Sequence, residues 1–256
     1  MIKLAVFDID GTLIDRNEGF IRPSVIEVFK KLKKSGIKVV IATGRTYFII
    51  QNEIFERLDF DYVISGNGTK ITDSNNNVLY GEKIDPTILK DLIADLYKNG
   101  DKMSIEFSQG LLNINGFEKL NSLGNVGDID VDVDFAYTGM GSFPSGKVDW
   151  YIKKYPNLDF ISAGITNNYD AVPKGVNKRK ALGLICKKLN ISQEEIVAVG
   201  DGINDIDMLN YAGLSIAMGN SCDELKEISD YITDDVTEDG IRNAFIKLKI
   251  ISEDDC

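Results

Sequence analysis

The chain has 256 residues, of which 43% are hydrophobic and 27% charged, and its formal net charge at pH 7 is −11. These values are typical of a globular protein with a full core, and the negative charge argues against a broad nucleic-acid surface. The sequence contains no histidine, which excludes histidine-based triads and histidine metal sites. Proton transfer near neutral pH must then involve carboxylates, lysine, tyrosine, cysteine or water.

The first residues and the cysteines favour a cytoplasmic location. The chain begins with a strand-like run that lacks the apolar core and cleavage site of a signal peptide. Apolar runs such as Val39–Ala42 are too short to span a bilayer. Three widely spaced cysteines give no disulfide framework. We therefore expect a cytoplasmic monomer or small homo-oligomer without a membrane partner.

The first third of the chain alternates strand and helix signals. Buried strands are predicted at Ile2–Phe7, Ile37–Ala42 and Tyr62–Ser65, because each is a short and nearly continuous apolar run. Helices are predicted at Pro23–Lys34 and from about Arg45 to Leu58. Strands that alternate with helices at these lengths indicate βαβ crossovers and a parallel sheet.

The pattern changes after about Gly81 and returns near Val176. Between these points the sequence predicts an amphipathic helix and scattered short strands, at Asp85–Lys98, Met103–Phe107, Leu111–Ile114, Val131–Tyr137 and Leu158–Ala163, with a helical segment at Lys147–Lys154. Beyond Val176, alternation predicts helices at Asn177–Leu189, Asn204–Tyr211, Cys222–Ile228 and Glu238–Leu248, and strands at Ile196–Val199 and Leu214–Ala217.

These patterns predict an α/β protein with two parts. Residues 1–81 and 171–256 form a Rossmann-like parallel-sheet core, and residues 82–170 form an inserted, smaller α+β domain. In open parallel sheets, ligand sites gather outside the carboxyl ends of the strands. Polar residues that follow the core strands are therefore the candidates for a functional site.

Four polar clusters follow core strands, and each has an ordinary structural explanation when taken alone. Asp8 and Asp10 precede a glycine and can mark an Asp-Gly turn. Thr43 and Gly44 can form a helix N-cap. Lys178 can be a solvated surface lysine. The segment Gly200–Asp205 can be a capped helix start, and a calcium-loop reading fails because Ile203 and Ala212 stand where oxygen ligands are needed.

The combination is more specific than its members. Five motifs follow one another along the chain: Asp8-Ile9-Asp10-Gly11-Thr12, Ala42-Thr43-Gly44-Arg45, Ser65-Gly66-Asn67-Gly68, Lys174-Gly175-Val176-Asn177-Lys178 and Gly200-Asp201-Gly202-Ile203-Asn204-Asp205. The chain thereby resembles the haloacid dehalogenase-like (HAD) superfamily, and within it the Cof-type sugar-phosphatase branch, over essentially its whole length. One departure is Arg179, which follows Lys178 where the family often has glycine.

The resemblance implies a Mg²⁺-dependent phosphomonoester hydrolase that acts on a small phosphorylated metabolite such as a sugar phosphate. Asp8 would be the nucleophile that forms an aspartyl-phosphate, and Asp10 the general acid and base. Residues 82–170 would be the cap that selects the leaving group. Mg²⁺ would be held by the Asp8 carboxylate, the Asp10 carbonyl and Asp201, with Asp205 as a direct or outer ligand, and the phosphate would be bound by Thr43, Gly44, Lys178 and Asn204.

Three rival functions use a similar scaffold. A haloacid dehalogenase needs no acid to protonate a halide, so Asp10 counts against it. A phosphomutase of the phosphomannomutase type would retain a bisphosphorylated sugar and release little phosphate. A non-enzymatic sugar-phosphate sensor would tolerate the loss of a catalytic acid, yet every expected acid is present. The phosphatase is therefore preferred over the mutase, and the mutase over the sensor.

Overall fold

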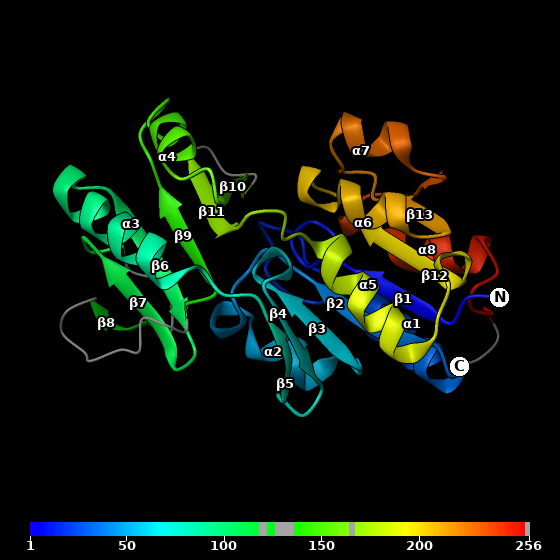
Figure 1. Cartoon of the computed structure of the whole chain (residues 1–256). Coiled ribbons are helices and arrows are strands. Elements are labelled where there is room, and N and C mark those ends of the chain that lie inside the picture. The colour runs from blue at the N-terminus through cyan, green and yellow to red at the C-terminus, as the bar shows by residue number, and fades with distance from the viewer. Residues whose placement is uncertain (118–121, 126–135, 164–166, 254–256) are drawn as a thin grey trace.

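The computed structural model describes residues 1–117, 122–125, 136–163 and 167–253, which form two β-sheets with their helices (Figure 1). The larger sheet has eight strands in the order β14-β13-β12-β1-β2-β3-β4-β5. The strands from β14 to β3 run parallel, and β4 and β5 extend this sheet antiparallel. The strands are β1 (Leu4–Phe7), β2 (Lys38–Ala42), β3 (Tyr62–Ser65), β4 (Lys70–Asp73), β5 (Val78–Gly81), β12 (Ile196–Gly200), β13 (Leu214–Ala217) and β14 (Tyr231–Ile232).

Helices cover both faces of this core sheet. Side chains alternate along a strand, so Phe7 of β1 packs on one side against Phe29 and Phe245, and Val6 packs on the other side with Leu182. Burial on both faces explains the continuous apolar runs of the core strands. The first face carries α1 (Pro23–Lys34), α2 (Asn52–Arg57) and α8 (Gly240–Lys247), and the second carries α5 (Lys178–Leu189), α6 (Ile206–Tyr211) and α7 (Asp223–Ile228).

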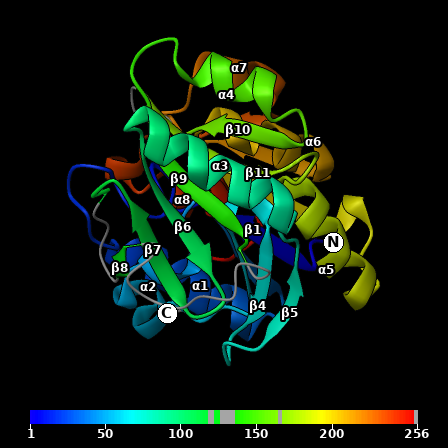
Figure 2. The same ribbon diagram turned by 60° about the vertical axis from the view of Figure 1, so that its left-hand side comes forward.

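The second sheet, with its two helices, is called the cap below. It has six strands in the order β10-β11-β9-β6-β7-β8, and one face packs against α3 (Pro86–Asn99) and α4 (Val148–Lys154). Figures 1 and 2 show these helices on the side of the cap sheet that faces away from the core. The cap strands are β6 (Lys102–Phe107), β7 (Gly110–Ile114), β8 (Ser122–Asn125), β9 (Thr138–Ser142), β10 (Leu158–Ser162) and β11 (Asn168–Pro173).

A buried ion pair joins the two sheets. Lys70 of β4 lies 3.0 Å from Glu106 of β6, measured from Nζ to Oε1, and both side chains are buried. The other carboxylate oxygen of Glu106 accepts a hydrogen bond from the backbone N–H of Tyr47 at 3.3 Å. The Lys70 ammonium also lies 4.9 Å from the centre of the Tyr47 ring and 5.1 Å from that of Tyr137. The inner face of the cap sheet is thereby fixed over one end of the core sheet.

The predicted class, a parallel α/β core with a smaller α+β insertion, is confirmed by the two sheets. The predicted helix from about Arg45 to Leu58 is wrong in part, because it is divided into a 3-10 turn at Tyr47–Ile49 and the short helix α2. Ile50 and Gln51 between them are extended, with ψ angles of 128° and 138°, and this break buries the Ile50 side chain. Most of the strand predicted at Val131–Tyr137 lies outside the described residues.

Several strands carry no clear signal in the sequence. The central cap strand β9 reads Thr-Gly-Met-Gly-Ser, a composition that is poor for strands. Its Gly139 leaves room for a neighbouring side chain, because a Cβ at this position would lie 2.5 Å from the sulfur of Met103 on the neighbouring strand. Strand β11 ends at Pro173 in the cap sheet, and the domain limits at 82–170 stay a prediction.

Within the part of the chain that the structure describes, none of the helices is long and apolar enough to cross a membrane. Cys186 and Cys222 are free thiols. Cys256 lies outside the described residues.

Candidate active site

The carboxyl ends of β1, β2, β3 and β12 meet at the edge of the core sheet that faces the cap (Figure 1). The chain runs from β1 to β2 and β3 on one side and from β12 to β13 on the other, so the strand order reverses between β1 and β12. Asp8 directly follows β1, and Asp201 directly follows β12. Such a reversal opens a crevice at the carboxyl ends of the strands, where ligands bind in folds of this kind.

Lys178 joins two of the predicted acids. It is the first residue of α5, and its Nζ lies 2.6 Å from Oδ1 of Asp8 and 2.5 Å from Oδ1 of Asp205. The ammonium is buried, with 1% of the residue exposed. Burial would lower its pKa, but the charges of Asp205 and Asp8 outweigh this and raise the pKa of Lys178. Lys178 therefore stays charged and holds Asp8 in place.

Asp8, Asp201 and Asp205 form a cluster of three buried acids. Each offers a carboxylate oxygen, and these oxygens lie within 4.8 Å of one another. Asp205 is tied down by its second oxygen, which accepts hydrogen bonds from the backbone N–H groups of Asp201 at 3.1 Å and Gly202 at 3.0 Å. Thr12 donates a further hydrogen bond to Asp201 at 3.2 Å. The acids are thus held in a defined arrangement rather than as a loose surface group.

The charge of this cluster fits a divalent cation. Burial, reinforced by the charge of Asp205, raises the pKa of Asp201 to about 6. Burial also raises the pKa of Asp8, in spite of the opposing charge of Lys178. Three carboxylates face the buried ammonium of Lys178 and the partly exposed guanidinium of Arg16, and the negative charge that remains is costly to bury. Hard oxygen donors of this kind suit Mg²⁺.

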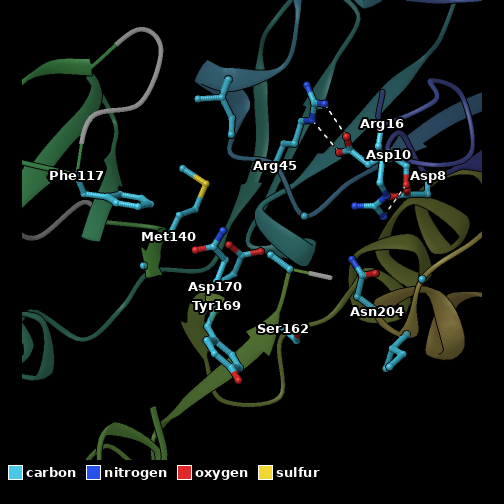
Figure 3. A pocket seen from close by; sticks show the side chains of 17 residues that line it. Asp8, Asp10, Arg16, Arg45, Phe117, Met140, Ser162, Tyr169, Asp170 and Asn204 are labelled. Atoms are coloured by element: carbon cyan, nitrogen blue, oxygen red, sulfur yellow. Dashed lines mark hydrogen bonds and ion pairs between the residues drawn. The ribbon is translucent and has the colours of Figure 1, made fainter. Parts of the chain in front are cut away.

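Asp10 has a different partner from Asp8. Strand β1 ends at Phe7, so the two acids lie on the turn that follows the strand rather than on the strand itself. Arg45 donates two hydrogen bonds to the Asp10 carboxylate, at 2.8 and 2.6 Å (Figure 3). Burial alone would raise the pKa of Asp10, but the hydrogen bonds and charge of Arg45 outweigh it and hold that pKa below its usual value.

Arg16 contacts two groups that the resemblance assigns to the metal. Its Nη2 donates a hydrogen bond to the backbone carbonyl of Asp10 at 2.9 Å and lies 3.4 Å from Oδ2 of Asp201. A guanidinium on these oxygens indicates that a cation is favoured there. The side chain of Arg16 is 44% exposed, so it can move away without disturbing the core.

The residues predicted to bind phosphate lie around the same point. Thr43 is buried, and its hydroxyl accepts a hydrogen bond from the backbone N–H of Arg45 at 3.1 Å. Gly44 lines the cavity described below, and so does Asn204, whose side-chain amide donates to Asn67 at 3.1 Å. The structure thus brings all eight predicted site residues to the carboxyl ends of the core strands.

A cavity of about 340 Å³ lies between these residues and the cap. Figure 3 shows Asp8, Asp10 and Arg45 on the core side, and Phe117, Met140 and Tyr169 on the cap side. This volume is within the range of pockets that enclose small molecules. The residues that line it are Asp8, Asp10, Arg16, Gly44, Arg45, Ile49, Phe117, Met140, Gly141, Ser162, Ala163, Asn168, Tyr169, Asp170, Gly202, Ile203 and Asn204.

The sequence did not identify Arg16, Arg45, Asn67 and Asp170 as site residues. Arg45 and Asn67 stand in the quoted motifs, so their position after a core strand was an available signal. Arg16 has the weaker signal of a basic residue shortly after the first two acids. Asp170 has none, because it reaches the site from the cap strand β11, 103 residues away from its partner Asn67.

Comparisons with known proteins agree with this geometry. The family model for haloacid dehalogenase-like hydrolases matches residues 5–134 and 145–245. The 5-amino-6-(5-phospho-D-ribitylamino)uracil phosphatase YcsE of Bacillus subtilis is 31% identical over 254 residues, which cover 95% of this chain and 94% of YcsE. An HMP-PP phosphatase of Yersinia pestis is 25% identical over 253 residues, with coverages of 89% and 87%.

Solved structures of this family are similar to the chain over almost its whole length. A sugar phosphatase of HAD subclass IIB superimposes with a TM-score of 0.86 at 25% identity, covering 97% of this chain and all of the other. The chain belongs to the haloacid dehalogenase-like hydrolases, which confirms the resemblance indicated by its motifs, including that to the Cof-type branch. Because its curated relatives include phosphatases that match over almost their full length, the chain is a phosphatase of this family.

Proposed function

We propose that the chain is a Mg²⁺-dependent phosphomonoester hydrolase that transfers the phosphoryl group of a small metabolite, such as a sugar phosphate, to Asp8 and then to water. The observation that carries the proposal is the position of Asp8. Its carboxylate lines the cavity, is held by Lys178 at 2.6 Å, and lies beside the buried acids Asp201 and Asp205. A carboxylate fixed in this way is suited to nucleophilic attack on a bound phosphate.

Four residues would hold Mg²⁺. These are Asp8 and Asp201 through their carboxylates, Asp10 through its backbone carbonyl, and Asp205 directly or in support. The ion would supply positive charge that offsets the repulsion between the carboxylates and an incoming phosphate. The excess negative charge of the three buried acids is the property of this chain that calls for such an ion.

Two displacements at phosphorus would complete the reaction. In the first, an oxygen of Asp8 forms a bond to phosphorus, the bond to the leaving oxygen breaks, and Asp10 gives that oxygen a proton. In the second, Asp10 takes a proton from water, the water oxygen attacks phosphorus, and the Asp8 carboxylate is released together with inorganic phosphate. Asp10 thus alternates between acid and base, and the chain contains no histidine that could take over this role.

The lowered pKa of Asp10 keeps its carboxylate ionised, which is the form that takes a proton in the second displacement. For the first displacement it must carry a proton. An anionic phosphate close to Asp10 opposes the effect of Arg45, because a nearby negative charge favours the protonated carboxyl. Substrate binding would thereby raise the pKa of Asp10 at the stage at which a proton donor is needed.

Fixed donors would bind the transferring phosphoryl group. Thr43 and Gly44 follow β2, Lys178 begins α5, and Asn204 follows β12, so the four come from three different segments. Gly44 and Asn204 line the cavity, and Lys178 contacts Asp8, which also lines it. Donors that are fixed before the reaction stabilise charge on the phosphoryl oxygens without reorganisation. The substrate class is inferred from the cavity of about 340 Å³ and from relatives named as phosphatases of small phosphorylated compounds.

The variant Asp8→Asn tests the nucleophile. With Mg²⁺ and an activated aryl phosphate, we expect hydrolysis to be abolished while the circular dichroism spectrum is unchanged. The matched control is Asp59→Asn, since Asp59 is an exposed acid outside the cavity lining. In wild type, rapid acid quenching and mass spectrometry should find a phosphate group on the peptide that contains Asp8. Full activity of Asp8→Asn would exclude the mechanism.

A screen of phosphorylated metabolites distinguishes the alternatives. A phosphatase releases inorganic phosphate from one or more monoesters, whereas a mutase returns an isomer of the sugar phosphate and a sensor binds it unchanged. Addition of EDTA should suppress phosphate release, and Mg²⁺ should restore it. Turnover that is independent of metal would remove the proposed ion from the site.

A further inference from the structure

The motif Ser65-Gly66-Asn67-Gly68 is without a function in the mechanism described above. Its Asn67 follows the carboxyl end of β3, is 1% exposed, and has left-handed backbone angles of φ 54° and ψ 26°. Its backbone N–H donates to the carbonyl of Thr43 at 3.0 Å. A buried side chain in this conformation needs specific partners for its polar atoms.

Both ends of the Asn67 amide have such partners. Its Nδ2 donates to Oδ2 of Asp170 at 2.8 Å, and its Oδ1 accepts from Nδ2 of Asn204 at 3.1 Å. An ionised carboxylate only accepts hydrogen bonds, so the amide nitrogen must face Asp170 and the oxygen must face Asn204. Asn67 therefore connects a core residue of the proposed phosphate site with strand β11 of the cap.

This connection lies against the proposed phosphate site. A Cβ built on Gly44 would lie 3.1 Å from Oδ1 of Asn67 and 3.3 Å from Oδ2 of Asp170. Asp170 is itself buried and lines the same cavity (Figure 3). A shift of β11 would thus move the side-chain amide of Asn67, which lies close to Gly44 and is hydrogen-bonded to Asn204.

We propose that Asn67 is a positioning residue, which holds Asn204 in its phosphate-binding place only while Asp170 of the cap contacts the core. The inference rests on the proposed function, since it assigns Asn204 to the phosphate. It adds that the position of the cap and the geometry of the phosphate site are coupled through this amide. A misplacement of about 1 Å in a binding group can reduce turnover by about a hundredfold, so such a coupling is measurable.

The hydrogen bond between Asn67 as donor and Asp170 as acceptor can be tested by exchanging the two side chains. Asn67→Asp keeps an acceptor for Asn204 but places a second carboxylate against Asp170. We expect kcat to fall by about tenfold to a hundredfold, and the dissociation constant of inorganic phosphate, measured by calorimetry with Mg²⁺, to rise by about tenfold or more. Adding Asp170→Asn places an amide donor opposite the new carboxylate. The double variant should recover both quantities to within about threefold of wild type.

Two further variants complete the experiment. Asp170→Asn alone retains an acceptor oxygen for the Asn67 amide, and we expect a smaller loss from it than from Asn67→Asp. Asn67→Gly keeps the left-handed backbone without the side chain, and we expect it to weaken phosphate binding as Asn67→Asp does. Thermal unfolding of each variant is measured in parallel, because a merely structural role would lower the melting temperature without changing kcat or phosphate binding.

The outcomes are separable. A double variant no better than Asn67→Asp, or an Asn67→Asp variant with wild-type phosphate binding, overturns the inference. The calorimetric cycle needs no turnover, so it still reports on the coupling if wild type fails to hydrolyse any monoester. That failure, with the cycle as expected, would contradict the proposed function alone.

Discussion

Arg45 holds the carboxylate of Asp10 with two hydrogen bonds, from Nε to Oδ2 at 2.8 Å and from Nη2 to Oδ1 at 2.6 Å. The guanidinium fork matches the carboxylate edge to edge, so it fixes the direction in which Asp10 faces as well as its charge. Arg45 also follows Thr43 and Gly44 directly in the sequence. The loop proposed to bind phosphate therefore also orients the proposed acid and base.

The variant Arg45→Lys tests this orientation. Lysine keeps the positive charge but loses the two parallel hydrogen bonds. We therefore expect proton transfer by Asp10 to be slowed more than the other steps of the reaction. We expect kcat/KM to fall by about tenfold to a hundredfold with an alkyl phosphate. With 4-nitrophenyl phosphate, whose leaving group needs no proton, the fall should be smaller. Equal losses for both substrates would contradict the assignment.

The contact of Arg16 with the Asp10 carbonyl and Asp201 predicts competition with Mg²⁺. Arg16→Ala removes a cation from the oxygens proposed to bind the ion, so Mg²⁺ affinity should increase, by about two- to fivefold for a partly exposed charge. Calorimetric titration of the metal-free protein measures this directly. Arg57→Ala is the control, because Arg57 pairs with Glu53 on α2 outside the cavity lining. Unchanged or weaker Mg²⁺ binding in Arg16→Ala would contradict the competition.

The sequence predicted most of the core because its signals are local. The strands at 38–42 and 196–200 are short apolar runs between helices, and a run buried on both faces has few other interpretations. Asp8 directly follows β1 and Asp201 directly follows β12, so the strand order brings these two acids together. Lys178 begins α5 after the cap strand β11, and it was named as a site residue because its motif resembles that of the family.

Contacts that join distant segments could not be predicted. Asp170 and Asn67 are 103 residues apart, and Lys70 and Glu106 belong to different sheets. Asn67 stands in a motif after a core strand, but the other three residues look in sequence like ordinary surface residues, since polar and charged residues are mostly exposed. Strand β9 was missed for a related reason, because Gly139 makes it a poor strand by composition and its role depends on Met103 of a neighbouring strand.

The lowered pKa of Asp61, a residue outside the active site, predicts that the stability of the protein depends on pH. Burial would raise its pKa, but Lys33, the backbone N–H of Val39 and Lys38 outweigh it and lower the pKa. The folded protein thus binds this proton less tightly than the unfolded chain. The stability that Asp61 contributes is therefore fully present above about pH 4, the ordinary aspartate range, and is lost as the pH falls through the lowered pKa.

The variant Asp61→Asn should accordingly be less stable than wild type at about pH 6, by about 1 kcal/mol for a partly exposed group. The difference should shrink as the pH approaches about 3. Urea unfolding at a series of pH values measures the free energy of unfolding in both proteins. Asp59→Asn serves as the control for a nearby exposed acid. A difference that grows on acidification would show that the sign is wrong.

A substitution at Gly11 tests the metal site, and the same substitution at Gly19 shows how much of its effect is backbone strain alone. Its φ angle is +91°, and a Cβ at this position would lie 2.2 Å from Oδ2 of Asp201. Gly19 has a φ angle of +70° with nothing within 4 Å of its Cβ position. Alanine should therefore cost stability at both positions, by about 1–2 kcal/mol, but should displace a proposed metal ligand only at Gly11.

We expect Gly11→Ala to weaken Mg²⁺ binding by about tenfold to a hundredfold, as displaced or unsupported ligands do in other metal sites. Gly19→Ala should bind Mg²⁺ as wild type does. Calorimetry with both folded variants gives the comparison, and activity at saturating Mg²⁺ shows whether Asp201 can still reach its place. Equal Mg²⁺ affinity in the two variants would mean that Asp201 does not bind the ion, and would leave Asp8 and Asp205 as the acids that hold it.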